Sequence, residues 1–308
     1  MPGLTYDQLS SITKEKFIPK LVNNIFLSNV LFMRMKEKGN YKSLDGGKKI
    51  LQPIIYAQNT SGGWYTGSDS LVTTGVQTRT ALAFDWKFQY QSITLNRTDI
   101  LQNMGDSQVI DLVKAEVEIA EMTMKDRFGT GLFSAGTDAN SITGSRVFGS
   151  TSNTYGGISQ TTNSWLQAQV DSTTTTLSIT ALQTLYELAS EDTDQPTIGV
   201  TTRTLYNKLY GQYQPAQRFM DSDVAKGGFR NLLFNGVPVV VDSHTPANNF
   251  HFYNEDYLQL YYHSQENFRF EDFLRIPTQN TNFAKIWWAG EYVCSSPRKQ
   301  AFATALTA

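Results

Sequence analysis

The chain has 308 residues, which is enough for about two ordinary domains and for a sizeable core without disulfides or metals. Charged residues make up 18% of the chain and aromatic residues 12%, whereas average soluble domains are roughly 25% charged. The net charge of −2, without a basic block, excludes tight binding to a nucleic-acid backbone, and no apolar run approaches the roughly 20 residues of a membrane span. Such a composition favours broad, permanent contacts with neighbouring molecules.

The single cysteine, Cys294, excludes an internal disulfide framework and suits a reducing compartment. We expect it to be a small buried residue of a strand. The N-terminus lacks a basic start followed by an apolar run, so the sequence predicts neither secretion nor insertion into a membrane.

Residues 1–44 are predicted to form an N-terminal arm that is extended or partly helical and is interrupted by Pro19. The arm carries an apolar cluster, with Phe26 and Phe32 in it, that needs a surface to cover it. That surface could belong to another subunit.

Residues 45–85 are predicted to form an extended loop built on a β-hairpin. A β-rich run with Pro53, typical of an edge strand, precedes a glycine-rich tip, and a run rich in Thr, Val and aromatic residues follows it. An isolated pair of strands is marginally stable, so the hairpin has to lie on something, either its own domain or another molecule. Trp64 and Tyr65 lie in the polar tip, where burial against their own domain is hard, and are candidates for an intermolecular anchor.

The clearest helix is predicted at residues 107–128. Ser107 is a plausible cap, and Gly129 and Gly131 are expected to end the helix. One apolar stripe at spacings of three and four comprises Ile110, Val113, Val117, Ala120, Met124 and Phe128.

The second half of the chain alternates helices and strands of mixed length. Helices are expected at residues 180–189 and 205–210, and strands after Pro196 and in several late segments that end with residues 285–294. This pattern predicts an α+β fold rather than a regular series of parallel units.

The sequence offers no catalytic, cofactor-binding or metal-binding site. We expect the three histidines, His244, His251 and His263, to be structural. The neighbouring acids Glu255 and Asp256 would face apart in a strand, whereas paired acid and base catalysis needs them to converge. No nucleophile elbow or phosphate-binding loop is present, so the sequence predicts that the chain is not an enzyme.

Five segments in order carry a resemblance to a known family: SGGWYTGSDS at 61–70, the long amphipathic segment that opens at Ser107, TYGGISQTTNSW from Thr154, GFRNLLFNGVPVVVDSHTP from Gly228, and IWWAGEYVCSSPRKQAF near the end. Together they resemble the major capsid proteins of tailed double-stranded DNA bacteriophages, which have the Hong Kong 97-like fold. The resemblance covers nearly the whole chain, which makes it more specific than any one segment.

This resemblance implies an N-terminal arm at 1–44, an extended loop at 45–85, a peripheral domain at 86–170 with a spine helix at 107–128, an axial domain at 171–275, and return strands with a C-terminal segment at 276–308. It also implies self-assembly into pentamers and hexamers of an icosahedral head that encloses double-stranded DNA. The implied location is the virion, assembled in the host cytoplasm.

The implied partners are further copies of the chain, a separate scaffolding protein, a portal, decoration proteins and DNA held without sequence specificity. Candidate inter-subunit contacts are Trp64, Tyr65, Phe26 and Phe32. The alternative is another assembling virion protein such as a tail-tube subunit. Tail-tube subunits usually lack a long spine helix, so the helix at 107–128 argues against this alternative.

Overall fold

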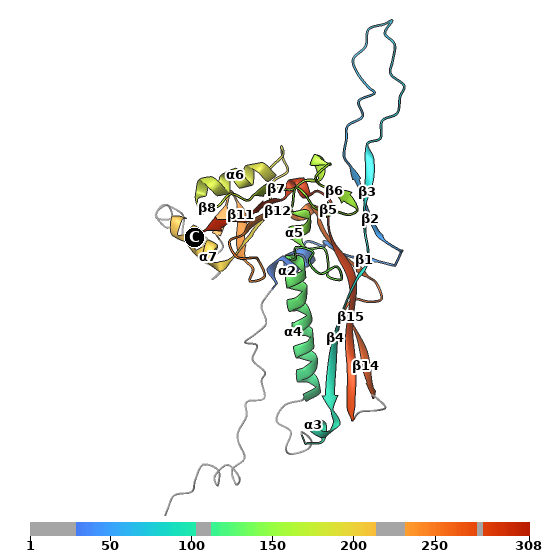
Figure 1. The fold of residues 1–308 in the computed structure, drawn as a ribbon, viewed down its shortest axis with the longest axis vertical. Coiled ribbons are helices and arrows are strands. Elements are labelled where there is room, and N and C mark those ends of the chain that lie inside the picture. Colours follow the sequence, from blue (N-terminus) through green and yellow to red (C-terminus); the bar gives the residue numbers. More distant parts are fainter. Residues whose placement is uncertain (1–28, 103–111, 214–231, 276–279) are drawn as a thin grey trace, which may run out of the picture. The chain divides into compact units, whose positions relative to one another are not determined.

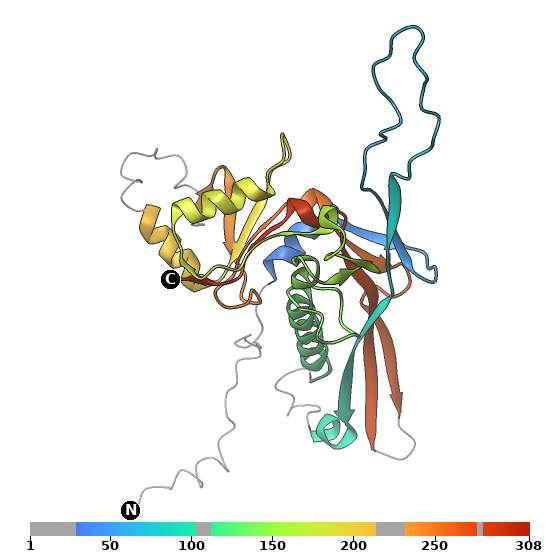
Figure 2. The same cartoon turned by 45° about the horizontal axis from the view of Figure 1, so that its top comes forward.

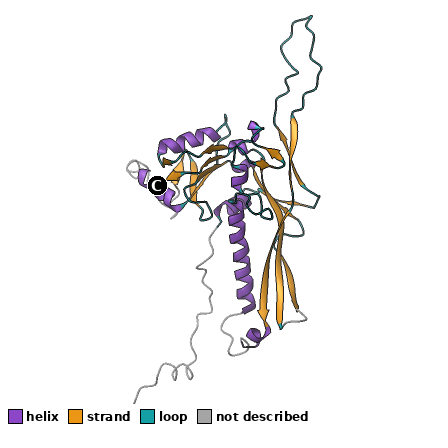
Figure 3. Ribbon diagram, viewed as in Figure 1, coloured by secondary structure: helices purple, strands orange, loops and turns teal. Residues whose placement is uncertain are grey.

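The computed structural model describes residues 29–102, 112–213, 232–275 and 280–308 (Figure 1). Helices and strands alternate along the chain, so the expected α+β class is confirmed (Figure 3). The chain divides into two units. Unit 1 comprises residues 1–26, 90–124 and 270–286, and unit 2 comprises residues 27–89, 125–269 and 287–308.

Unit 1 is a helix on a sheet. The strand β15, Thr281–Cys294, pairs with β14, Arg269–Arg275, and with β4, Lys87–Asn96, which continues into the short helix α3, Arg97–Gln102. The helix α4, Leu112–Leu132, runs beside these strands (Figures 1 and 2). The buried residues in the described part of this unit are Ile93, Leu95, Ala120, Met124, Ala284 and Ile286. They form a small core of alternating strand positions and one helical stripe.

The 21 residues of α4 confirm the expected long helix. Of the predicted stripe, Ala120, Met124 and Phe128 are buried. The expected start at Ser107 lies outside the described residues. The expected end at Phe128 is wrong, because the helix continues to Leu132.

Gly129 and Gly131 lie within α4 and do not end it. At both positions a side chain from another segment packs where a Cβ atom would lie. A Cβ atom on Gly129 would lie 2.6 Å from the imidazole of His244, and one on Gly131 would lie 2.9 Å from Ile142. Close approach, rather than a turn, explains these two glycines.

Three strands of one five-stranded sheet contribute residues to unit 2. β1, Tyr41–Leu44, runs parallel to β13, Leu258–His263, and β13 runs antiparallel to the last residues of β15, with Leu258 opposite Cys294. The expected strand at residues 285–294 is therefore part of one long strand of 14 residues.

An aromatic cluster covers this sheet. Phe128 packs edge-on against Trp288 with ring centroids 4.8 Å apart, and Phe32 packs on Phe128 at 5.1 Å. The Trp288 Nε1 donates a hydrogen bond to the Tyr41 hydroxyl at 3.2 Å, and Tyr41 stacks on Tyr262. Burial raises the pKa of Tyr41 to about 12.

A second, six-stranded sheet lies entirely within unit 2. Its strand order is β10-β11-β9-β12-β16-β7. The bounds are Leu232–Phe234 for β10, Val237–Val241 for β11, Ile198–Thr201 for β9, Phe250–Tyr253 for β12, Ala301–Ala303 for β16 and Gln169–Asp171 for β7. β9 pairs parallel with β11 and antiparallel with β12, so the sheet is mixed.

Two helices pack against the six-stranded sheet (Figure 2). α6, Ile179–Ala189, and α7, Arg203–Tyr213, share one buried apolar cluster with Phe250 and Phe252 of β12. The alternate residues of β12 and β16 point to the other face of the sheet, where His251 contacts Phe133 and Phe302 contacts Phe148. Both expected helices of this region are confirmed, and the side chain of Ser178 caps α6 by accepting from the Ala181 amide.

The expected domain boundaries stay a prediction, and the strands between residues 171 and 275 belong to two different sheets. Within residues 171–275, β9 to β12 belong to the six-stranded sheet, whereas β13 and β14 belong to the other sheet. The remaining short elements are α5 (Ser145–Phe148), β5 (Thr154–Tyr155), β6 (Ile158–Ser159), η2 (Ser164–Leu166), β8 (Thr175–Thr176), η5 (Glu255–Tyr257), η6 (Pro297–Lys299) and β17 (Leu306–Thr307).

Cys294 is fully buried at the end of β15, as expected. Its amide donates to the Tyr155 hydroxyl at 2.6 Å, and the same hydroxyl donates to the Cys294 carbonyl at 3.1 Å. Burial raises the pKa of this thiol. None of the helices in the described part of the chain combines the length and the apolar character needed to cross a bilayer.

Candidate assembly surfaces

A two-stranded hairpin projects from unit 2. β2, Ile50–Ile55, pairs antiparallel with β3, Arg79–Phe84, from Ile50 opposite Phe84 to Ile55 opposite Arg79. The expected hairpin is present, but its paired part is shorter than the sequence predicted, because residues 71–78 form no strand. Pro53 lies in β2, which pairs only with β3 in the described structure. Such an edge strand tolerates proline, which has no N–H to donate to a neighbouring strand.

The base of the hairpin is fixed to its own unit. Leu82 and Phe84 are buried, and the Phe84 ring packs on Tyr155 at 5.1 Å. The Ala83 amide donates to the Gly156 carbonyl at 3.0 Å, and a Cβ atom on Gly156 would lie 2.6 Å from Leu82. These contacts fix the base of the hairpin to unit 2.

The tip of the hairpin, residues 57–78, is mostly exposed. Trp64 is fully exposed at 105%, Tyr65 is 68% exposed, and Leu71 and Val72 are exposed to a similar degree. Exposed apolar side chains gathered on one projecting loop mark a surface for another molecule. This surface, residues 57–78, is called the tip surface below (Figure 1).

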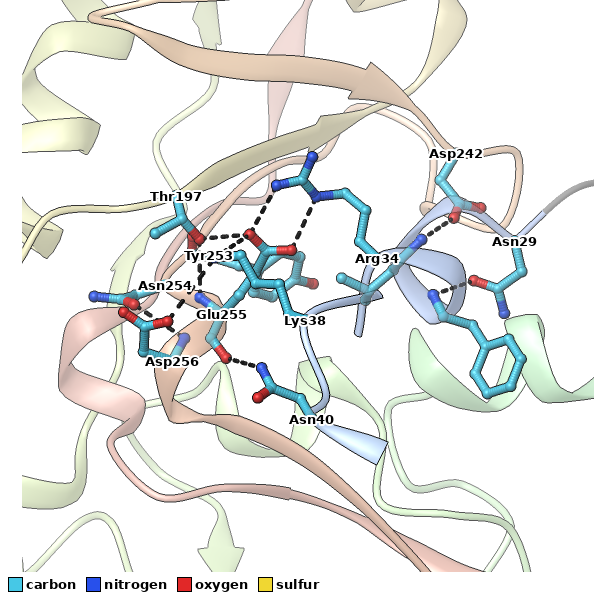
Figure 4. Close-up of polar contacts among 12 residues, drawn as sticks. Asn29, Arg34, Lys38, Asn40, Thr197, Asp242, Tyr253, Asn254, Glu255 and Asp256 are labelled. Atoms are coloured by element: carbon cyan, nitrogen blue, oxygen red, sulfur yellow. Dashed lines mark hydrogen bonds and ion pairs between the residues drawn. The ribbon is translucent and has the colours of Figure 1, made fainter. Parts of the chain in front are cut away.

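The helix α2, Val30–Glu37, lies where residues 1–28 join the described chain. Asn29 caps it by accepting from the Phe32 amide at 3.0 Å, and the Asp242 carboxylate accepts from the Val30 amide at 3.1 Å (Figure 4). Leu31 and Met35 on its inner face are fully buried. The two caps satisfy amides that the first turn of a helix leaves without partners.

A buried carboxylate holds the outer face of α2. The Glu255 side chain is fully buried and accepts two bonds from the Arg34 guanidinium, at 2.9 and 3.0 Å (Figure 4). The Lys38 ammonium lies 3.0 Å from the same carboxylate, and the Thr197 hydroxyl donates to it at 2.7 Å. The Asn40 side chain donates to the Glu255 carbonyl at 2.6 Å. These contacts form the Glu255 clamp.

Charge balance makes this burial possible. Burial alone would raise the pKa of Glu255, but hydrogen bonds from Arg34, Thr197 and Lys38 outweigh it and lower that pKa below its ordinary value. The same carboxylate raises the pKa of Arg34. The clamp therefore stays ionised at neutral pH and fixes the point from which the N-terminal residues leave unit 2.

The structure places the four candidate contact residues differently. Trp64 and Tyr65 lie together on the tip surface. Phe26 lies outside the described residues. Phe32 is half-buried on α2, and its ring packs against Tyr41 and Phe128 of the same chain. An inter-subunit role for these residues remains a prediction.

The histidines occupy three different environments. His251 is fully buried, and burial, with a smaller effect of Arg146, lowers its pKa to about 3. The His263 ring lies 5.5 Å from Trp86. His244 bridges two carboxylates. In the described part of the chain, no group of three or more His, Cys, Asp or Glu side chains could hold a metal ion.

Sequence reasoning missed the Glu255 clamp. It considered Glu255 only as a neighbour of Asp256, whereas its partner Arg34 lies 221 residues away. No local spacing signals such a pair. The one available hint is that an acidic residue of a buried strand end needs a cationic partner somewhere in the chain.

Comparison with known proteins gives a consistent result for the fold. No protein-family model and no curated protein sequence matches the chain. Among solved structures, the capsid chain of cyanophage A-1(L) aligns with 99% of this chain and 100% of its own, with 18% identity and a TM-score of 0.73. A capsid chain of a native GTA particle aligns over 99% of both chains, with 11% identity and a TM-score of 0.69.

The capsid chain of the Myoviridae phage XM1 is also similar, with 11% identity, coverage of 99% and 100%, and a TM-score of 0.65. The SrpI encapsulin of Synechococcus elongatus aligns over 99% of this chain and 96% of its own, with 8% identity and a TM-score of 0.61. At these identities the likeness shows the fold. The chain has the fold of phage capsid proteins over its whole length, and the expected Hong Kong 97-like capsid fold is confirmed.

Proposed function

We propose that the chain is a major capsid protein that assembles into the pentamers and hexamers of an icosahedral phage head around double-stranded DNA. The observation that carries this proposal is the alignment of 99% of this chain with 100% of a cyanophage capsid chain. A match of that extent includes the hairpin, the long helix and both sheets, and does not depend on one common motif.

The tip surface supports assembly by overlapping contacts. Trp64 and Tyr65 offer large, stiff apolar side chains that are characteristic of the central residues of protein interfaces. The rigid base and the exposed tip would place these side chains on a neighbouring subunit. We assign the same role, from the N-terminal segment, to Phe26 and Phe32.

Within this function we assign residues 1–44 to an N-terminal arm and residues 45–85 to an extended loop. Residues 86–170, with α4 as the spine helix, and the return strands from 276 form the peripheral domain. The axial domain is centred on β9 to β12 with α6 and α7, since β13 and β14 belong to the other sheet.

The net charge of −2 suits a container that holds DNA without reading it. Partners would be further copies of the chain, a separate scaffolding protein, a portal and decoration proteins, with assembly in the host cytoplasm. We propose no enzymatic activity, because the contribution of such a chain is the geometry of its contacts. The encapsulin likeness leaves a second kind of content, protein cargo, as an outcome for experiment.

Electron microscopy of the purified full-length chain tests the proposal. We expect capsomers or closed shells, formed alone or after co-expression with a scaffolding protein. A compact monomer at every concentration and salt would contradict it. Stacked rings that form only uniform open tubes would favour a tail-tube subunit. Nuclease-protected double-stranded DNA in native particles would support a phage head, and protein cargo without DNA would favour an encapsulin-like compartment.

A further inference from the structure

His244 lies between two carboxylates from different parts of unit 2. Its Nδ1 lies 3.0 Å from Asp242 Oδ1, in the turn that follows β11. Its Nε2 lies 3.0 Å from Asp126 Oδ1, on the last turns of α4. The ring packs on the backbone of Gly129, where any side chain would displace it. Both nitrogens of one imidazole are therefore directed at acceptors.

The number of protons on the ring decides how many of these contacts are hydrogen bonds. A neutral imidazole has one N–H, whereas an imidazolium has two. Because both carboxylate oxygens can only accept, the neutral ring satisfies one and presents a lone pair to the other. The carboxylates lie at opposite ends of the ring and do not converge on a point that a metal could occupy.

The two carboxylates differ in their access to water. Asp242 is fully buried, whereas the Asp126 side chain is 35% exposed. Asp242 Oδ1 also accepts from the His244 backbone amide at 3.0 Å, so it keeps that partner whichever ring nitrogen is protonated. Water can replace the ring proton at the partly exposed Asp126 but not at the buried Asp242, so the neutral ring keeps its proton toward Asp242. Loss of the second proton therefore breaks the contact between the ring and α4.

Asp242 connects this ring to α2. Its second oxygen, Oδ2, accepts from the Val30 amide at 3.1 Å and lies 3.5 Å from the Leu31 amide. The turn of residues 242–245 is thus held to α4 through His244 on one side and caps α2 on the other. The first turn of α2 contains no acidic residue that could replace this cap.

We propose that His244 is a pH-operated tie between α4 and the turn that caps α2, closed when both ring nitrogens carry protons and open when the ring is neutral. The tie lies beside Asn29, the first described residue of the chain, at the start of α2. It does not depend on the proposed function, since every group involved belongs to one chain.

Electrostatics favour the doubly protonated ring. Asp242 raises the pKa of His244 through its hydrogen bond, burial lowers it, and Asp126 raises it further, with a net shift upward. Among the described groups, Tyr253 of β12 also interacts with Asp242; its pKa is raised mainly by burial, so it stays neutral. Because the folded pKa of His244 exceeds its ordinary 6.5, the tie is complete below pH 6.5 and is lost as pH rises through the folded value.

Hydrogen exchange of the full-length chain between pH 5.5 and 8.5 tests the tie. Rates are corrected for intrinsic exchange, and the assembly state is checked to be the same throughout. In the wild type we expect opening of residues 242–245 and of the first turn of α2 to rise about fivefold with pH, the equivalent of one net hydrogen bond. The strand β12 provides an internal reference for global stability.

Two variants and a control decide the outcome. His244→Gln and Asp126→Asn should both abolish the pH response of this region, whereas His263→Gln, which removes an imidazole elsewhere in unit 2, should keep it. If His244→Gln fails to fold, Asp126→Asn decides alone, because it changes a partly exposed side chain. A wild type without pH response, or the wild-type response retained in Asp126→Asn, would overturn the proposal.

Discussion

Arg34 and Glu255 form a two-bonded ion pair across 221 residues of sequence, and the carboxylate of this pair is fully buried. A buried acid with two bonds from a guanidinium has its charge balanced and its geometry fixed at the same time. The pair therefore determines where α2, and with it the N-terminal segment, is attached.

Replacing Glu255 with Gln should destabilise the unassembled subunit by about 3 kcal/mol, because Arg34 and Lys38 then lose their common counter-charge in a partly buried site. Urea unfolding measures the effect. The control is Asp256→Asn, whose side chain is 73% exposed and 3.8 Å from Lys38, and which should cost less than about 1 kcal/mol. Equal effects of the two variants would show that the clamp is an ordinary surface pair.

Trp64→Ala should leave the stability of the isolated subunit unchanged and weaken assembly by about 2 kcal/mol for each contact, since the indole is fully exposed in the subunit. Light scattering gives the concentration at which assembly begins. Trp288→Ala is the contrasting variant, because Trp288 is 1% exposed and its loss should destabilise the subunit by about 4 kcal/mol. Normal assembly of Trp64→Ala, with a less stable subunit, would contradict the role of the tip surface.

Glu291 should make the subunit less stable as pH rises. Its Oε1 accepts from the amides of Thr143 and Tyr292, its Oε2 has no partner among the described residues, and burial raises its pKa to about 7. Because the folded pKa exceeds the ordinary 4.5, the stability contributed by this group is complete below pH 4.5 and lost by about pH 7, a change of about 3 kcal/mol.

Glu291→Gln should remove that part of the pH dependence, so the difference in unfolding free energy between variant and wild type should vary between pH 4.5 and 7. The exposed Asp192→Asn, at a left-handed backbone position that Asn accepts, should show no such variation. A parallel pH profile for Glu291→Gln and the wild type would refute the assignment.

Gly129→Ala should destabilise the subunit by about 2 kcal/mol, although alanine normally stabilises a helix, because its Cβ would lie 2.6 Å from His244. Gly211→Ala in α7 is the matched change, since no atom lies within 4 Å of its Cβ position, and it should stabilise by up to about 1 kcal/mol. Thermal unfolding of the two variants should shift in opposite directions. A shared direction would mean that helix propensity, not the imidazole, controls residue 129.

The proposed shell should contain no covalent links between subunits. Residues 50–78 contain no lysine, Lys49 at the hairpin base pairs with Asp85 at 3.2 Å, and Cys294 is buried. Denaturing electrophoresis of particles should give one band near 34.6 kDa. Multimers that survive boiling and reductant would show the opposite.

Local patterns predicted those elements whose cause is local. The stripe of α4 and the helix expected at residues 180–189 depend on residues three or four positions apart; Ala120, Met124 and Phe128 of the stripe are buried, and α6 spans Ile179–Ala189. The paired length of the hairpin was predicted poorly, because Thr and Val at residues 71–78 favour strands that only pair when a partner lies beside them.

The remaining features depend on distant residues. Gly129 has the sequence signature of a helix end, and only the position of His244 shows that it is a packing site. The same holds for the tip surface. The sequence predicted the exposure of Trp64, but not the packing of Leu82 on Gly156 that fixes the base of the projecting hairpin. Tertiary contacts override local signals at these positions.

The reaction rate of Cys294 with a thiol reagent can report how often the native structure opens. The thiolate is the form that alkylating reagents attack, and the buried thiol with its raised pKa is protected from them in the native state. Its slow modification therefore measures how often β15 opens. A second cysteine in place of Trp64 would react rapidly in a free subunit and slowly when another molecule covers the tip surface. Labelling both cysteines in one protein therefore distinguishes unfolding of the subunit from burial of the tip surface in a particle.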